Sequence, residues 1–246
     1  MKTIWMAAVV IACAMVPKAA RAESEPRETE TGVAEHWAES TLTVVLDPSL
    51  DDLGPGARDA VRAAMTTWTT DVAGLPSVTF VDGAERVGAA RDHVSVVSAG
   101  PITLDGHEKD LALTTTYAED TTGGILEADV VFNTRYAFAS MATPAVGCNK
   151  VFDVGSVATH ESGHFFGLGE DWDDQAATMY VITDPCDVHK RVLTPEDTDA
   201  LGALYATPAA MTASCDGSPV RPRKGAVELV ALGFALALGA RRMRRA

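Results

Sequence analysis

Residues 160–171 read HESGHFFGLGED, and this stretch decides both the fold and the chemistry that the sequence predicts. It contains the pattern HExxH, in which His160 and His164 are four residues apart and lie on the same face of a helix. One metal ion can contact both imidazoles, and Glu161 between them can take a proton from an attacking water. Gly167 can adopt a left-handed conformation that ends the helix, so a third ligand can turn back to the metal.

The third ligand has more than one candidate in the sequence. Glu170 is first, because it stands three residues after the glycine that ends the helix. Asp171 is the alternative, and His189, farther along the chain, is a distant third. Carboxylate oxygen and imidazole nitrogen are both ordinary Zn²⁺ ligands. The sequence therefore predicts one catalytic zinc ion, held by the two histidines and Glu170.

The extended motif resembles that of the metzincin zinc peptidases, and among them the matrixins. Their pattern is HExxHxxGxxH followed by a turn that contains a methionine. Residues 177–180, ATMY, match that turn, with Met179 as the apolar floor under the metal and Tyr180 as a candidate for the substrate pocket. The chain departs from the matrixin pattern at Glu170, where matrixins have a third histidine and snapalysin-like metzincins have an aspartate.

Further similarity to the matrixins extends over about residues 40–206. Residues 128–133 (ADVVFN) resemble the strand that edges the matrixin cleft, residues 152–159 the approach to the active-site helix, and residues 191–205 the closing helix. The resemblance implies an α+β domain with a twisted mixed sheet, a long active-site helix and a C-terminal helix. It also implies a zinc endopeptidase that cleaves proteins or peptides, with the substrate added to the strand at 128–132.

Hydrophobic patterns place the other elements. Residues 61–72 carry apolar side chains at helical spacing, Asp153 is a natural N-cap for a helix to about residue 168, and Thr194-Pro195 begins another helix. Short apolar or β-branched runs predict strands at 41–46, 77–81, 93–97, 111–114 and 128–132.

The N-terminal end has the features of an export signal. Residues 1–22 hold a lysine, an apolar run and a final Ala-x-Ala, so we expect cleavage before Glu23. A lipoprotein signal ending at Cys13 is the alternative. Residues 23–39 are rich in glutamate and lack apolar periodicity, which predicts a flexible acidic leader.

The C-terminal end predicts attachment to the cell surface. Residues 207–220 form a linker with Cys215, and residues 221–246 combine an apolar run with a final arginine cluster. This arrangement resembles myxosortase-type sorting tails, in which a cysteine precedes the apolar run; a plain tail anchor is the alternative. The sequence thus predicts an exported domain, outside the cell or on its surface, with membrane association only through this tail.

The remaining cysteines, Cys148 and Cys186, flank the HExxH region. In an exported chain they form a plausible disulfide, with two free thiols as the alternative.

The formal net charge is −14, and both ends are basic, so the segment between them is more acidic still. Such a surface repels nucleic acid. Ca²⁺ could bind the carboxylates of Asp171, Asp173 and Asp174, but a solvated acidic face is the better explanation of them. We expect a monomer.

Two other functions stay open at this stage. The domain could have lost its activity and bind a partner, an alternative suggested by Glu170 in place of histidine. It could also be a gluzincin-type peptidase with Glu196 as third ligand, which the short distance from Gly167 to Met179 disfavours.

Overall fold

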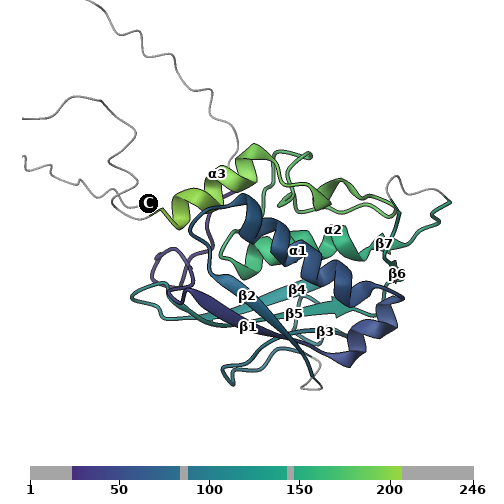
Figure 1. Cartoon of the computed structure of the whole chain (residues 1–246), viewed down its shortest axis with the longest axis horizontal. Helices are drawn as coiled ribbons and strands as arrows, with labels where there is room; N and C mark the ends of the chain where they lie inside the picture. Colours follow the sequence, from purple (N-terminus) through teal and green to yellow (C-terminus); the bar gives the residue numbers. More distant parts are fainter. Residues whose placement is uncertain (1–23, 84–87, 143–146, 207–246) are drawn as a thin grey trace, which may run out of the picture.

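A computed structural model describes residues 24–83, 88–142 and 147–206, which form one sheet covered on one face by helices (Figure 1). The strand order is β2-β1-β3-β5-β4, and only β4 runs antiparallel to its neighbour. The strands are β1 (Thr41–Leu46), β2 (Ser77–Asp82), β3 (Ser95–Gly100), β4 (Ala112–Ala118) and β5 (Ile125–Asn133). This mixed sheet confirms the predicted α+β class.

Two helices pack on the sheet and on each other. Helix α1 (Ala57–Asp71) buries one face, whereas α2 (Val154–Phe165) is buried on every side. Trp68 of α1 is fully buried, and its indole N–H donates to the carbonyl of Thr159 in α2 at 2.8 Å. The helix that carries the HExxH motif is therefore a core element, held between α1 and the sheet.

The shorter elements complete the frame around α2. They are two 3₁₀ helices, η1 (Pro48–Leu53) and η2 (His189–Arg191), the strand pair β6 (Phe138–Ala139) and β7 (Phe152–Asp153), and helix α3 (Pro195–Leu204). Helix α3 begins with a capping box, in which Thr194 and Asp197 each accept a hydrogen bond from the other's backbone N–H.

The structure confirms every strand and helix predicted above, with shifted ends, but it corrects the position of the edge strand. Residues 128–132 belong to β5, which lies between β3 and β4 and is buried at every residue except Leu126. The sheet edge beside α2 is β4, so the prediction that a substrate pairs with residues 128–132 was wrong. Strands buried on both faces carry continuous apolar runs, and the VVF sequence of β5 indicates that interior position.

The segment predicted as a flexible leader is also different from expectation. From residue 24 onward it forms isolated bridges with the domain, including Pro26 with Leu168 and His36 with Gly124. Trp37 is buried and donates its indole N–H to the carbonyl of Phe165 at 2.7 Å. Backbone pairing needs no apolar periodicity in the paired segment, so composition alone could not reveal it.

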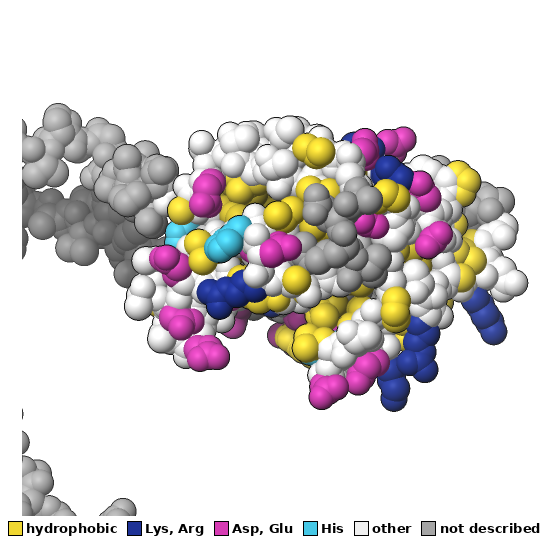
Figure 2. All heavy atoms as spheres, turned by 90° about the horizontal axis from the view of Figure 1, so that it is seen from below, with side chains coloured by type: hydrophobic (Ala, Val, Ile, Leu, Met, Phe, Trp, Pro, Cys, Tyr) yellow, Lys and Arg dark blue, Asp and Glu magenta, His cyan; other side chains and the backbone are white. Residues whose placement is uncertain are grey.

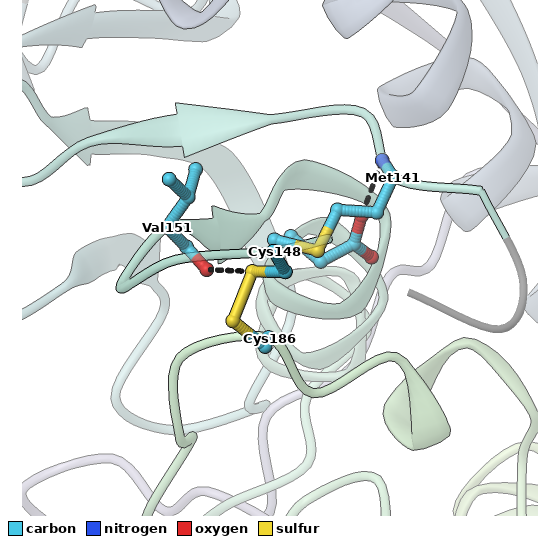
Figure 3. The surroundings of a disulfide bond; sticks show 5 residues. Met141, Cys148, Val151 and Cys186 are labelled. Atoms are coloured by element: carbon cyan, nitrogen blue, oxygen red, sulfur yellow. Dashed lines mark hydrogen bonds between the residues drawn. A yellow bond between two sulfur atoms is a disulfide. The ribbon is translucent and has the colours of Figure 1, made fainter. Parts of the chain in front are cut away.

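Cys148 and Cys186 form a disulfide, as the sequence predicted, with their Cα atoms 5.7 Å apart (Figure 3). The bond joins the loop before β7 to the loop that follows the methionine turn. Cys215, the signal at 1–22, the linker and the tail at 221–246 lie outside the described residues. In the part of the chain that the structure covers, no helix is long and apolar enough to cross a membrane.

Charged side chains of both signs are spread among apolar ones over the face seen from below in Figure 2. The excess of acid in the sequence is thus distributed over this face, as expected of a solvated surface.

Replacing Gly167 with alanine should destabilise the fold. Its φ is +104°, and a Cβ there would meet the backbone carbonyl oxygen of Glu35. Gly54 has nearly the same φ, +106°, but open space around it, so Gly54→Ala isolates the conformational cost of about 1–3 kcal/mol. We expect Gly167→Ala to lower the free energy of unfolding in urea by clearly more than Gly54→Ala. Equal losses would show that the backbone of Glu35 does not leave too little space for a side chain at residue 167.

Replacing Asp153 with asparagine should give a pH-dependent loss of stability. Burial raises the pKa of this carboxyl, but hydrogen bonds from Arg191 and from the backbone N–H groups of Met141 and Ser156 outweigh it, so the pKa lies below its ordinary 3.8. A lowered folded-state pKa stabilises the protein above pH 3.8, and this stabilisation disappears as the pH falls through the folded-state value.

Asp153→Asn should therefore cost about 3–5 kcal/mol at pH 7, because a buried pair is broken, and the difference from wild type should shrink towards pH 3. Asp51→Asn is the control, since Asp51 pairs with Arg58 on the surface with 67% of its side chain exposed; its cost should stay below about 1 kcal/mol. Urea unfolding at several pH values measures both. A loss at Asp153 that does not change with pH would contradict the assignment.

Candidate metal centre

His160 and His164 lie on successive turns of α2 with their ring centroids 4.7 Å apart. Each ring is oriented by a backbone carbonyl: His160 Nδ1 lies 2.8 Å from the oxygen of Thr178, and His164 Nδ1 lies 2.8 Å from that of Leu168. A nitrogen that faces a carbonyl must carry the proton, so in the neutral rings Nε2 has the lone pair. Both rings thus present a ligand atom to the same point.

Glu170 faces that point from the opposite side. Its Oε2 lies 3.4 Å from His160 Nε2, and its Oε1 lies 3.3 Å from His164 Nε2. These distances exceed the usual 2.7–3.2 Å of an N–H···O bond, and Oε2 is buried without a hydrogen-bond donor. A cation between the three side chains would satisfy all of these atoms, so the donor set fits Zn²⁺.

No other group of three or more His, Cys, Asp or Glu side chains within the described residues brings its ligand atoms this close together. Asp171, the alternative ligand, is not in the cluster. Its Oδ1 accepts hydrogen bonds of 2.8 Å from the backbone N–H groups of Asp173 and Asp174, which shapes the following turn. The three aspartates thus give no support to Ca²⁺ binding. His189 pairs with Asp187 at the surface, away from the cluster.

The electrostatics follow from this proximity. Burial would raise the pKa of Glu170, but the close polar contacts with His160 and His164 and their positive charge when protonated outweigh it and hold that pKa well below its usual range. Burial would lower the pKa of His164, but Glu170 and Glu161 raise it overall. Glu170 therefore keeps its negative charge opposite a protonated histidine, and would keep it opposite a metal ion.

Glu161 is held by a residue that the sequence did not identify. Thr114 of β4 donates its hydroxyl proton to Glu161 Oε2 at 2.6 Å. This bond fixes the carboxylate and leaves Oε1 to accept from another donor. Only the pairing of β4 with the sheet places Thr114 opposite α2, so no local pattern in the sequence could single it out.

Met179, which the resemblance places under the metal, packs against the glycine of the HExxH motif. It is fully buried, and its sulfur touches the position that a Cβ on Gly163 would occupy. A glycine at this position of the motif therefore lets the methionine turn approach α2 closely. Tyr180, expected at a substrate pocket, lines neither of the two cavities beside the cluster, and its ring centroid lies 6.0 Å from Lys190 Nζ.

Two buried charges brace the methionine turn, and neither was predicted as a site residue. Asp197 accepts the backbone N–H of Thr178 at 2.8 Å, while Lys190 donates to the carbonyl of Tyr180. Burial lowers the pKa of Lys190 to about 8, although four carboxylates oppose this shift. The backbone of Thr178 thus connects Asp197, through its N–H, to the ring of His160, through its carbonyl.

Comparison with known protein families agrees with this geometry. The family model described as Matrixin matches residues 36–206, so the chain belongs to the matrixin family. This is a family of zinc metallopeptidases. A comparison with curated proteins finds no match.

The third ligand can be tested by comparing Glu170→Gln with Asp171→Asn. We expect Glu170→Gln to weaken Zn²⁺ binding by at least about 100-fold, beyond what the loss of an outer-shell partner costs. Asp171→Asn should change the affinity by less than about tenfold, because it weakens only two turn hydrogen bonds. Competition with a chromogenic chelator measures both. A larger loss in Asp171→Asn would make Asp171 the ligand.

Proposed function

We propose that this protein is an exported zinc endopeptidase that hydrolyses peptide bonds with Glu161 as general base. The observation that carries the proposal is the convergence of three lone-pair donors, from His160, His164 and Glu170, beside the carboxylate of Glu161, which a threonine hydroxyl orients. A purely structural metal site has no use for a base at the position of Glu161.

Each residue around the cluster has a separate role in this reaction. A bound Zn²⁺ would supply Lewis acidity, which lowers the pKa of water and polarises a carbonyl. Glu161 accepts the proton of the attacking water and later gives it to the leaving amine. Thr114 holds Oε2 of that carboxylate throughout, so that Oε1 faces the water. Thr178 and Leu168 keep the imidazole rings in place by accepting their Nδ1 protons.

The substrate would pair with β4. Two cavities, of about 320 and 270 Å³, both contact Glu161 and Glu170, and Ala112 of β4 lines both of them. A peptide that passes from one cavity to the other therefore follows β4, whose outer side is a sheet edge. Backbone pairing along this edge would present the scissile bond to Glu161.

Export and surface attachment are part of the proposal and rest mainly on the two ends of the sequence. The disulfide between Cys148 and Cys186 supports them, because such bonds persist in oxidising compartments. The competing function, a binding domain without activity, predicts the same fold and metal content but no turnover.

Glu161→Gln separates these two functions. The purified, zinc-loaded protein should cleave a quenched peptide library, lose turnover with a chelator and regain it with Zn²⁺. Glu161→Gln should retain Zn²⁺ and cleave about 10²–10⁴-fold more slowly, because the proton acceptor is gone. Folded wild-type protein that contains Zn²⁺ and cleaves nothing would favour the binding domain.

A further inference from the structure

The larger of the two cavities beside the cluster has one wall made by a loop. Residues 181–183 line this cavity of about 320 Å³, opposite the α2 residues Val157, His160 and Glu161. Tyr136 and Phe152 also contribute aromatic side chains to it. An apolar side chain of a substrate fits such a lining. Because the cavity lies next to Glu161, that side chain would belong to a substrate residue that adjoins the cleaved bond.

The near end of this loop is fixed by the turn that follows the ligand Glu170. The N–H of Asp171 donates to the carbonyl of Met179 at 2.8 Å, and the N–H of Val181 donates to the carbonyl of Asp171 at 3.0 Å. Ile182, the next residue, has 56% of its surface exposed although it lines the cavity. The loop thus leaves the core at Ile182, so its position from there on depends on the contacts at its other end.

The far end of the loop is fixed at Cys186. Its N–H donates to the carbonyl of Val151 at 2.9 Å, and its sulfur is bonded to that of Cys148. Figure 3 shows this cross-link beside Val151. Cys186 has a φ of +70°, a left-handed conformation that is unfavourable for a non-glycine residue. One backbone hydrogen bond is a weak restraint against that preference, so the disulfide is the main restraint at this end of the loop.

The segment that receives the cross-link carries another wall of the same cavity. Val151 precedes Phe152, whose ring lies edge-on to that of Tyr136, with centroids 5.7 Å apart. Phe152 also pairs in register with Phe138 across β7 and β6. The disulfide therefore ties the loop at 181–186, whose first three residues line the cavity, to the segment that carries Phe152.

We propose that the Cys148–Cys186 disulfide determines substrate specificity, by fixing the width of the apolar cavity that receives the side chain next to the cleaved bond. This inference rests on the proposed peptidase function. The cross-link contacts neither the ligand atoms nor Glu161, so it acts by positioning the cavity wall and leaves the chemistry of the centre intact.

The test compares the zinc-loaded wild-type chain with the double variant Cys148→Ser/Cys186→Ser, which leaves no unpaired thiol at this site. Two peptides are used that differ only in one residue next to the cleaved bond, alanine in one and leucine in the other. Wild type should discriminate between them roughly tenfold or more, as hydrophobic pockets do. In the double variant this ratio of kcat/KM should fall at least about fivefold, mainly through KM.

A second pair of peptides, varied on the other side of the cleaved bond, is the control, and its ratio should not change. Equal losses for all four peptides, or an unchanged leucine-to-alanine ratio, would show that the disulfide only stabilises the fold. If the double variant does not fold, reduction of the folded wild-type protein with a phosphine gives the same comparison.

Amide hydrogen exchange separates a failure of this inference from a failure of the proposed function. In the double variant or the reduced protein, the amides of residues 181–184 and 186 should exchange at least about tenfold faster, while those of α2 remain protected. Absence of turnover in wild type would overturn the peptidase proposal. Unchanged exchange in 181–186 would overturn the role of the disulfide, whatever the activity.

Discussion

The whole centre depends on the reversal of the chain directly after α2. His160 and His164 are fixed to a buried helix, so Glu170 can oppose them only if the backbone turns back within a few residues. Gly167 allows the turn, and its N–H and that of Leu168 bond back to the carbonyls of His164 and Gly163. The carbonyl of Leu168 then orients the ring of His164 at 2.8 Å. This one turn thus orients the ring of His164 and places the carboxylate of Glu170 opposite both histidines.

The turn is braced from outside by the N-terminal segment. The N–H of Arg27 donates to the carbonyl of Gly167, and the N–H of Gly169 donates to that of Glu25. A Cβ on Gly169 would come within 2.9 Å of the Glu25 oxygen, so both glycines of the turn also make room for a neighbouring backbone. The start of the domain therefore belongs to its metal centre, although the two are more than 130 residues apart in sequence.

The methionine turn is a second support, and it couples the last helix to the histidine cluster. Asp197 caps α3 and accepts the N–H of Thr178, whose carbonyl faces His160 Nδ1. Replacing Asp197 would thus disturb the ring of His160, although His160 belongs to α2 and not to α3. Asp197 is fully buried, and these hydrogen bonds supply partners for its carboxylate oxygens.

The sequence predicted the elements whose signals are local. The HExxH spacing, the Asp153 cap, the glycine stop and the Thr194-Pro195 start each depend on a few neighbouring residues, and each is found in the structure. What it could not predict depends on long-range pairing. The interior position of β5, the role of Thr114 and the backbone pairing of residues 25–27 follow from which strands meet. The sequence left three candidates for the third ligand, Glu170, Asp171 and His189, and only the fold shows that Glu170 alone lies in the cluster.

The disulfide has a consequence for the unfolded chain as well. Its two cysteines are 38 residues apart, and the loop they close contains both histidines, Glu161, Glu170 and Met179. In the chain-entropy account, closing a loop of this size lowers the conformational entropy of the denatured ensemble and so raises its free energy by about 3–5 kcal/mol. An oxidised chain that unfolds therefore keeps its metal-binding groups within one short ring. Refolding then has to search a smaller volume to bring them together again.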